Sequence, residues 1–107
     1  MQRSFFYLVK TNPPTRDQFR SYYETGLVPA NASERQIELL KGVSMWATEA
    51  QTRALTARMR ERYDYVAEVA IPEGVRVTRQ GRSQGHHNVY ASPEELVRWV
   101  VRVTRAR

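Results

Sequence analysis

Three polar side chains alternate along the segment from residue 86 to residue 90, and their types and spacing are those of a ligand site. Side chains two positions apart in a strand lie on the same face, so His86, Asn88 and Tyr90 share one face. Val89 and Ala91 lie on the other face, which we expect to contact the core. An imidazole, an amide and a phenol in one row can hydrogen-bond a ligand in a cleft. The alternative is a polar sheet face exposed to solvent.

Two further residues could take part in nucleophilic or acid-base chemistry. Ser44 lies in a predicted strand, where its hydroxyl could act on a ligand or simply pack against a neighbour. Glu68 interrupts the otherwise apolar run 65–71. Such a glutamate is expected either at a sheet rim, paired with an arginine, or in a cleft as a general base or an acceptor for a ribose hydroxyl. The candidate catalytic residues are therefore Ser44, Glu68 and His86.

The glycine-bearing stretch 81–85 is predicted to be a basic connection between two strands. It has neither the Walker spacing nor the Rossmann fingerprint. Arg79 and Arg82 are candidates for binding an anion, and a solvated loop is the alternative. No metal site is expected, because the only two histidines, His86 and His87, are neighbours that point to opposite strand faces, and the chain has no cysteine.

The formal net charge of +6 lies mainly in the second half of the chain. Residues 1–50 carry six basic and five acidic residues, whereas residues 51–107 carry eleven and six, and all eleven are arginines. A basic half can bind phosphate polymers, so a nucleic-acid-binding module is one hypothesis and a solvated surface is the alternative. Arg58 and Arg62 share one face of a predicted helix and Arg53 lies on another, so no continuous basic stripe is predicted.

Length and composition bound the class of protein. At 107 residues we expect a single domain, 1–107, and 41% hydrophobic residues are enough for one core. No apolar run reaches the roughly 18 residues of a membrane span, and the N-terminus lacks the long apolar segment of a secretory signal. The absence of cysteine rules out a disulfide framework and favours a cytoplasmic protein.

Four Ser/Thr-x-x-Glu/Gln patterns mark predicted helix starts, because the two side chains can each bind a free backbone N–H of the first turn. Thr15 with Gln18 begins a helix of about ten residues that ends at Gly26, and Ser33 with Gln36 begins a short helix that ends at Gly42. Thr48 with Gln51 begins the longest helix, which runs to about Arg62. Ser92 with Glu95 begins the last helix.

Strands are predicted between these helices, at residues 5–9, 43–47, 65–71, 75–79 and 87–91. Residues 100–104 could extend the last helix or form a final strand, and the pattern does not decide between them. The order β-α-α-β-α-β-β-β-α lacks regular βαβ alternation. It favours a small α+β domain with a mixed or antiparallel sheet and about four helices.

Three local patterns resemble a known fold family: GVSMWATEA (42–50) running into a helix, YVAEVAIP (65–72), and GHHNVY (85–90) with PEEL (93–96). Together they resemble small uncharacterised actinobacterial proteins. The strand-Ser-aromatic-Thr-helix unit is similar to the core of the ADP-ribosyltransferase-like fold, which includes RNA 2′-phosphotransferases. The resemblance covers residues 4–103, which is most of the chain.

This resemblance implies a cleft that holds NAD or another nucleotide-type ligand and promotes a transfer reaction. In that fold a first-strand Arg or His, a second-strand Ser or Tyr and a later acidic or polar residue act together. Ser44 matches the second position, and His86 or Glu68 could supply the third. The first strand offers no Arg or His and has Lys10 at its end, while Trp46 would stack on a base or nicotinamide. The candidate ligand-binding residues are Lys10, Trp46, Arg79, Arg82, Asn88 and Tyr90.

Two other classes of function compete with a ligand-binding, transferase-like protein. The chain could be a non-catalytic accessory protein that binds a partner through Tyr22, Tyr23 and Trp99, although these aromatic residues also suit a core. It could also be the basic nucleic-acid-binding module. The sequence leaves open whether the chain is an enzyme and what its oligomeric state is.

Overall fold

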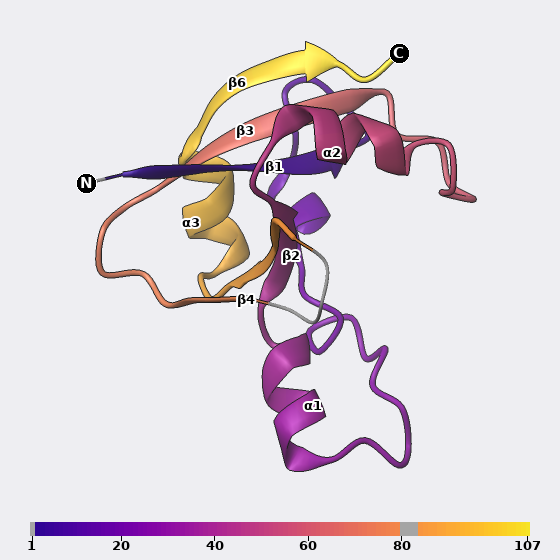
Figure 1. Cartoon of the computed structure of the whole chain (residues 1–107), viewed down its shortest axis with the longest axis vertical. Coiled ribbons are helices and arrows are strands. Elements are labelled where there is room, and N and C mark those ends of the chain that lie inside the picture. Colours follow the sequence, from indigo (N-terminus) through magenta and orange to yellow (C-terminus); the bar gives the residue numbers. More distant parts are fainter. Residues whose placement is uncertain (1, 80–83) are drawn as a thin grey trace.

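Six strands form one antiparallel sheet that carries helices on both faces (Figure 1). The structure is a computed structural model that describes residues 2–79 and 84–107. In chain order the elements are β1 (Arg3–Val9), the 3₁₀ helix η1 (Arg16–Phe19), α1 (Glu34–Leu40), β2 (Val43–Trp46), α2 (Glu49–Leu55), β3 (Tyr65–Ile71), β4 (Val77–Arg79), β5 (His86–Val89), α3 (Pro93–Arg98) and β6 (Val100–Arg105).

The strand order across the sheet is β4-β5-β2-β1-β3-β6, and every recorded ladder is antiparallel. This confirms an α+β chain and selects the antiparallel sheet over the mixed one. Residues 100–105 are a strand, because α3 ends at Arg98 and the Trp99 carbonyl accepts a hydrogen bond from the Ala70 amide at 2.9 Å. That bond leads the chain directly into its pairing with β3.

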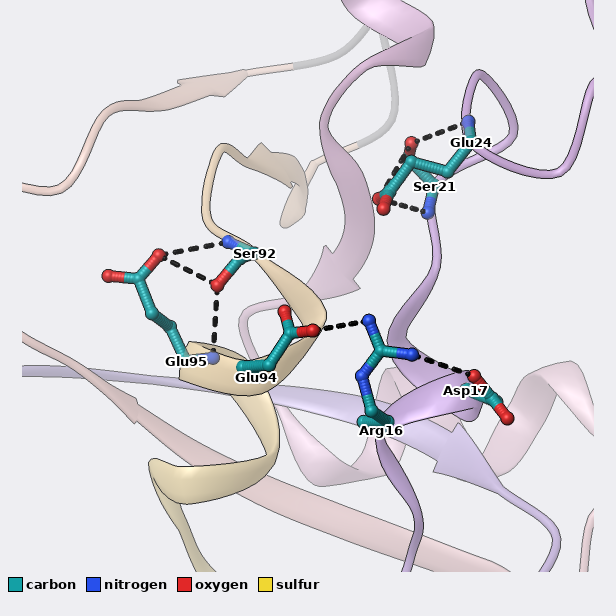
Figure 2. Close-up of polar contacts among 7 residues, drawn as sticks. All are labelled: Arg16, Asp17, Ser21, Glu24, Ser92, Glu94 and Glu95. Atoms are coloured by element: carbon teal, nitrogen blue, oxygen red, sulfur yellow. Dashed lines mark hydrogen bonds and ion pairs between the residues drawn. The ribbon is translucent and has the colours of Figure 1, made fainter.

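The first predicted helix is wrong, because only the four-residue turn η1 forms there. The Thr15 side chain makes no capping hydrogen bond. Its intended partner Gln18 reaches back instead, and its Oε1 accepts from the Lys10 amide at 2.6 Å. Burial of Phe19 then fixes the turn against the core, and a turn between Ser21 and Glu24 follows (Figure 2).

The longest predicted helix is also shorter than expected, since α2 ends at Leu55 and not near Arg62. The Thr56 amide and hydroxyl both donate to the Arg53 carbonyl, at 3.1 and 2.7 Å, so this carbonyl is bound inside a tightened last turn. Side-chain bonds of this kind compete with helix continuation. After the helix, Tyr63 packs against the same small apolar cluster as Leu55.

The other three helix starts are confirmed. Ser33 with Gln36 and Ser92 with Glu95 form reciprocal capping boxes at the starts of α1 and α3. Thr48 caps α2 by accepting from the Gln51 amide. The Gln51 side chain does not complete the box, because its amide donates to the Gln84 carbonyl at 2.6 Å.

Alternation along the strands divides the apolar side chains between the two sheet faces. Phe5 and Val9 of β1 join the main core cluster, which α3 and η1 cover with Leu96 and Phe19. Leu8 belongs to a second, smaller cluster on the opposite face, under α2. Full burial of one large apolar side chain stabilises the fold by about 1.5–3 kcal/mol, so the main cluster carries most of the stability.

Arg16 links η1 to α3. Its guanidinium forms ion pairs with Glu94 at the start of α3 and, at 3.2 Å, with Asp17 (Figure 2). The pair adds a surface contact between η1 and α3, which already pack against each other.

Helix α1 projects from one end of the molecule (Figure 1). None of the residues of α1, all of which the structure describes, is buried. In the described part of the chain no helix is both long and apolar enough to cross a membrane.

Candidate ligand-binding cleft

The two central strands β1 and β2 separate soon after they meet. Strand β1 pairs with β3 at every position from Arg3 to Val9, whereas among the described residues its register with β2 contains the single pair Phe6 and Trp46. In Figure 1, β2 runs steeply across β1. Beyond this junction the end of β1 and the start of β2 line an open cleft.

The cleft has two adjoining parts that share the lining residues Tyr7, Leu8, Tyr22, Ser44 and Tyr63. The aromatic part has a volume of about 300 Å³. The charged part has a volume of about 400 Å³. The aromatic part adds Trp46, Leu55, Met59 and His86. The charged part adds, among others, Lys10, Asp17, Gln18, Arg20 and Glu61.

Trp46 and His86 form one wall of the aromatic part. They face each other across the β2–β5 ladder, and their rings stack with centroids 4.5 Å apart and planes 10° from parallel. Partial burial lowers the pKa of His86, and the nearby His87 adds to the effect, so His86 is neutral near pH 7. Its Nε2 is buried and finds no hydrogen-bond partner among residues 2–79 and 84–107.

Ser44 and Asn88 lie side by side in the same ladder, on the face that carries Trp46 and His86. The Ser44 hydroxyl is 3.5 Å from Asn88 Oδ1, which is a long hydrogen bond. Asn88 is 1% exposed, and its Nδ2 lacks a partner among the described residues. A side chain at Gly42 would place its Cβ 2.7 Å from the Asn88 Cβ, so glycine is what permits this close packing beside the cleft.

Tyrosines surround the passage between the two parts. The Tyr7 ring stacks on Phe19 with centroids 5.3 Å apart. Burial raises the pKa of the Tyr7 hydroxyl, with smaller contributions from the phenols of Tyr63 and Tyr22. Tyr7 therefore stays neutral and can donate a hydrogen bond at any physiological pH.

Two opposite charges meet in the charged part. Lys10 Nζ lies 2.6 Å from Glu61 Oε2, and the Tyr63 hydroxyl donates to the same oxygen at 3.3 Å. The hydrogen bond to Glu61 raises the pKa of Lys10 and lowers that of Glu61. Arg20, which also lines this part, donates to the Glu24 carbonyl at 3.1 Å.

Of the three candidate catalytic residues, the structure brings Ser44 and His86 to the cleft and places Glu68 elsewhere. Glu68 is not among the described residues that line either part. Its carboxylate forms an ion pair with Arg102 at 3.1 Å and accepts from the Ser4 hydroxyl at 3.0 Å. The pairing with an arginine matches the first of the two alternatives for this residue, but Glu68 lies between β1 and β6 and not at a sheet rim.

Lys10 and Trp46 line the cleft, whereas Arg79, Asn88 and Tyr90 are not among the described residues that line it. The Tyr90 ring is covered by the Arg76 guanidinium at 4.3 Å, and Tyr90 shares a hydrogen bond of 3.3 Å with Thr78. Arg79 is exposed at the end of β4. Arg82 lies outside the described residues.

The aromatic residues predicted for partner binding are separated. Tyr22 is 53% and Tyr23 46% exposed, whereas Trp99 packs against the main core. Arginines of the basic half also have local partners, since Arg53 pairs with Glu49 and Arg62 with Asp64. Partner binding and nucleic-acid binding both stay predictions.

Sequence reasoning missed the lining residues Tyr7, Leu55, Met59, Glu61 and Tyr63. Met59, Glu61 and Tyr63 follow α2, and the helix expected to continue to about Arg62 would have included the first two. Their convergence depends on the early end of α2, for which the sequence offered the weak signal of Thr56 only. Among the described residues there is no group of three or more acidic or histidine side chains that could hold a metal ion.

No family model, curated protein or solved structure matched this chain. The resemblance to the ADP-ribosyltransferase-like fold and to actinobacterial proteins therefore stays a prediction. The geometry of the cleft carries the functional argument.

Proposed function

We propose that the cleft binds a nucleotide-type ligand, with a flat heteroaromatic ring in the aromatic part and an anionic group in the charged part. The supporting observation is that a stacked aromatic wall and a cationic side chain line two adjoining spaces. Their volumes of about 300 and 400 Å³ are those of small-molecule sites.

The aromatic part favours a planar ring for two reasons. Trp46 and His86 on one wall and Leu55, Met59 and Tyr63 around it provide apolar contact. Stacking of a base on an aromatic side chain stabilises binding by about 1–3 kcal/mol. The ring's edge can hydrogen-bond to the Ser44 hydroxyl, which lines both parts of the cleft.

The charged part supplies cations for a phosphate. Lys10 is held at the end of β1 by the bond between its backbone amide and Gln18. Arg20 lines the same part, and its guanidinium can offer several donors to phosphate oxygens. NAD carries both a flat ring and a diphosphate, so it belongs to the class of ligand proposed.

The proposal concerns the binding of the ligand and not a reaction of the ligand. A transfer reaction would use Ser44 and His86 at the ligand, with neutral His86 available to accept a proton. Because Glu68 pairs with Arg102 outside the cleft, an acidic partner for that reaction is not part of the proposal.

Tryptophan fluorescence tests the proposal, because the chain has two tryptophans and only Trp46 lines the cleft. In Trp99→Phe, where Trp46 is the sole reporter, we expect AMP and NAD to quench the fluorescence with saturation below millimolar concentration. The matched control is Trp46→Phe, in which the signal of Trp99 should not change. Unchanged Trp46 fluorescence at millimolar AMP and NAD, or equal changes in both variants, would show that the proposal is wrong.

A further inference from the structure

The ion pair between Lys10 and Glu61 lies at the charged part of the cleft. Lys10 follows β1, and Glu61 lies in the segment after α2, so the pair joins two segments that both line this part. The Lys10 side chain is 49% and the Glu61 side chain 61% exposed. An exposed pair of this kind exchanges readily with other ions, because water and salt compete for both partners.

Tyr63 holds the Glu61 carboxylate in this position. The Tyr63 hydroxyl donates to the Glu61 Oε2 atom that Lys10 contacts, and Lys10 Nζ lies 5.5 Å from the centre of the Tyr63 ring. Lys10, Glu61 and Tyr63 all line the charged part. A carboxylate oxygen therefore occupies the place where the lysine would meet an anionic oxygen of a ligand.

The two other charged side chains that line this part, those of Asp17 and Arg20, do not contact Lys10 or Glu61 in the interactions described for them. Asp17 pairs with the adjacent Arg16 at 3.2 Å. Arg20 donates to the main-chain carbonyl of Glu24. Lys10 is thus the lining cation whose partner is a carboxylate of the cleft itself.

We propose that the Glu61 carboxylate occupies the place of the ligand's anionic group, and that a phosphate of the ligand must displace Glu61 from Lys10. The inference rests on the proposed function and adds a selection rule to it. A phosphate monoester carries a charge of about −1.5 to −2 near pH 7 and three acceptor oxygens, so it competes well with a single carboxylate. A neutral nucleoside cannot displace Glu61. The cleft consequently selects nucleotides, which carry phosphate, over nucleosides.

Removal of the Glu61 charge tests this rule. In the Trp99→Phe protein, Glu61→Gln should raise the affinity for AMP by up to about fivefold, the upper limit set by the free energy of an exposed ion pair. The affinity for adenosine should not change. The matched control is Glu34→Gln on α1, which makes the same change in net charge away from the cleft and should alter neither affinity. Equal effects of Glu61→Gln on AMP and adenosine, or none on AMP, would contradict the proposal.

A second variant examines the cation. Lys10→Met should lower the affinity for AMP towards that for adenosine, with Arg20 as the remaining cation of the charged part. It should leave the affinity for adenosine unchanged, because the proposed position of the ring is in the aromatic part, away from the lysine. If Lys10→Met weakened AMP and adenosine equally, Lys10 would act through the structure of the cleft and the proposal would fail.

Inorganic pyrophosphate separates this inference from the proposed function. Its binding is followed by NMR shifts of the amides around Lys10, without any base. Tighter pyrophosphate binding to Glu61→Gln, with no nucleoside or nucleotide binding, would support the displacement and overturn the proposed ligand class. Nucleotide binding with equal AMP affinity in both proteins would overturn the displacement alone. No binding of any probe to either protein would overturn both.

Discussion

His86 combines a stacked ring, a buried Nε2 and a lowered pKa. The cause of the shift is first burial and then the nearby His87. A base whose pKa is lower in the folded than in the unfolded protein binds fewer protons when folded. The contribution of His86 to the free energy of unfolding is therefore fully present above the ordinary pKa of 6.5. It is lost as the pH falls from that value towards the lower pKa of the folded protein.

The lowered pKa of His86 predicts that part of the pH dependence of protein stability arises from this one side chain. The Tm of the wild-type protein should fall as pH is lowered from about 7.5 to about 5.5, and His86→Gln should remove part of that fall. His87 is still present in the variant, and carboxylates with lowered pKa such as Glu49 titrate below this window. Thermal unfolding followed by circular dichroism at both pH values gives the comparison. Parallel Tm profiles would contradict the assignment to His86.

At the scale of elements, α1 and α3 begin with the same capping box but differ in what they bury. In both helices the serine hydroxyl accepts from a backbone amide at 3.2 Å, from Gln36 after Ser33 and from Glu95 after Ser92. Helix α3 places Leu96 in the main core, whereas α1, which the structure describes completely, has no buried residue. Loss of the cap should therefore lower the global stability of the protein more at α3 than at α1.

We predict that Ser92→Ala lowers the free energy of unfolding by about 1 kcal/mol, the usual value of a serine cap. Ser33→Ala should lower it clearly less, because α1 can fray without exposing the core. Urea denaturation measures both, and hydrogen exchange of the α1 amides should accelerate in Ser33→Ala. Equal losses of global stability would show that α1 unfolds together with the core.

At the scale of the whole molecule, the strands divide into two groups, β4-β5-β2 and β1-β3-β6, which meet at Phe6 and Trp46. Despite this narrow junction they share one core. Val43 and Met45 of β2 lie in the same cluster as Phe5 of β1 and Val69 of β3. Because neither group can expose its face without opening the common cluster, we expect one cooperative transition.

The two tryptophans report on this cooperativity. Trp46 lies in β2, and Trp99 lies between α3 and β6. In the variants Trp99→Phe and Trp46→Phe, the urea transition seen by the remaining tryptophan should coincide with the transition of the same protein seen by circular dichroism. Distinct midpoints within one variant would mean that the two strand groups unfold separately.

Local signals were enough to predict much of the fold. A cap depends on residues three positions apart, so Ser33, Thr48 and Ser92 marked real helix starts. Alternation along a strand also depends on near neighbours only. It therefore placed His86 and Asn88 on one face before their partners were known. The helix predicted to begin at Thr15 did not form because of a non-local contact. The Gln18 side chain accepts a hydrogen bond from the Lys10 amide, eight residues away in the chain.

The cleft itself was decided by contacts between distant segments. The α+β class, three helix starts and the polar face that carries His86 could be predicted, because each depends on neighbouring residues. The separation of β1 and β2 beyond Trp46, the ion pair of Glu68 with Arg102 and that of Glu61 with Lys10 became evident in the folded chain alone. These outcomes depend on strand order and register across more than thirty residues, which no local pattern in this chain encodes.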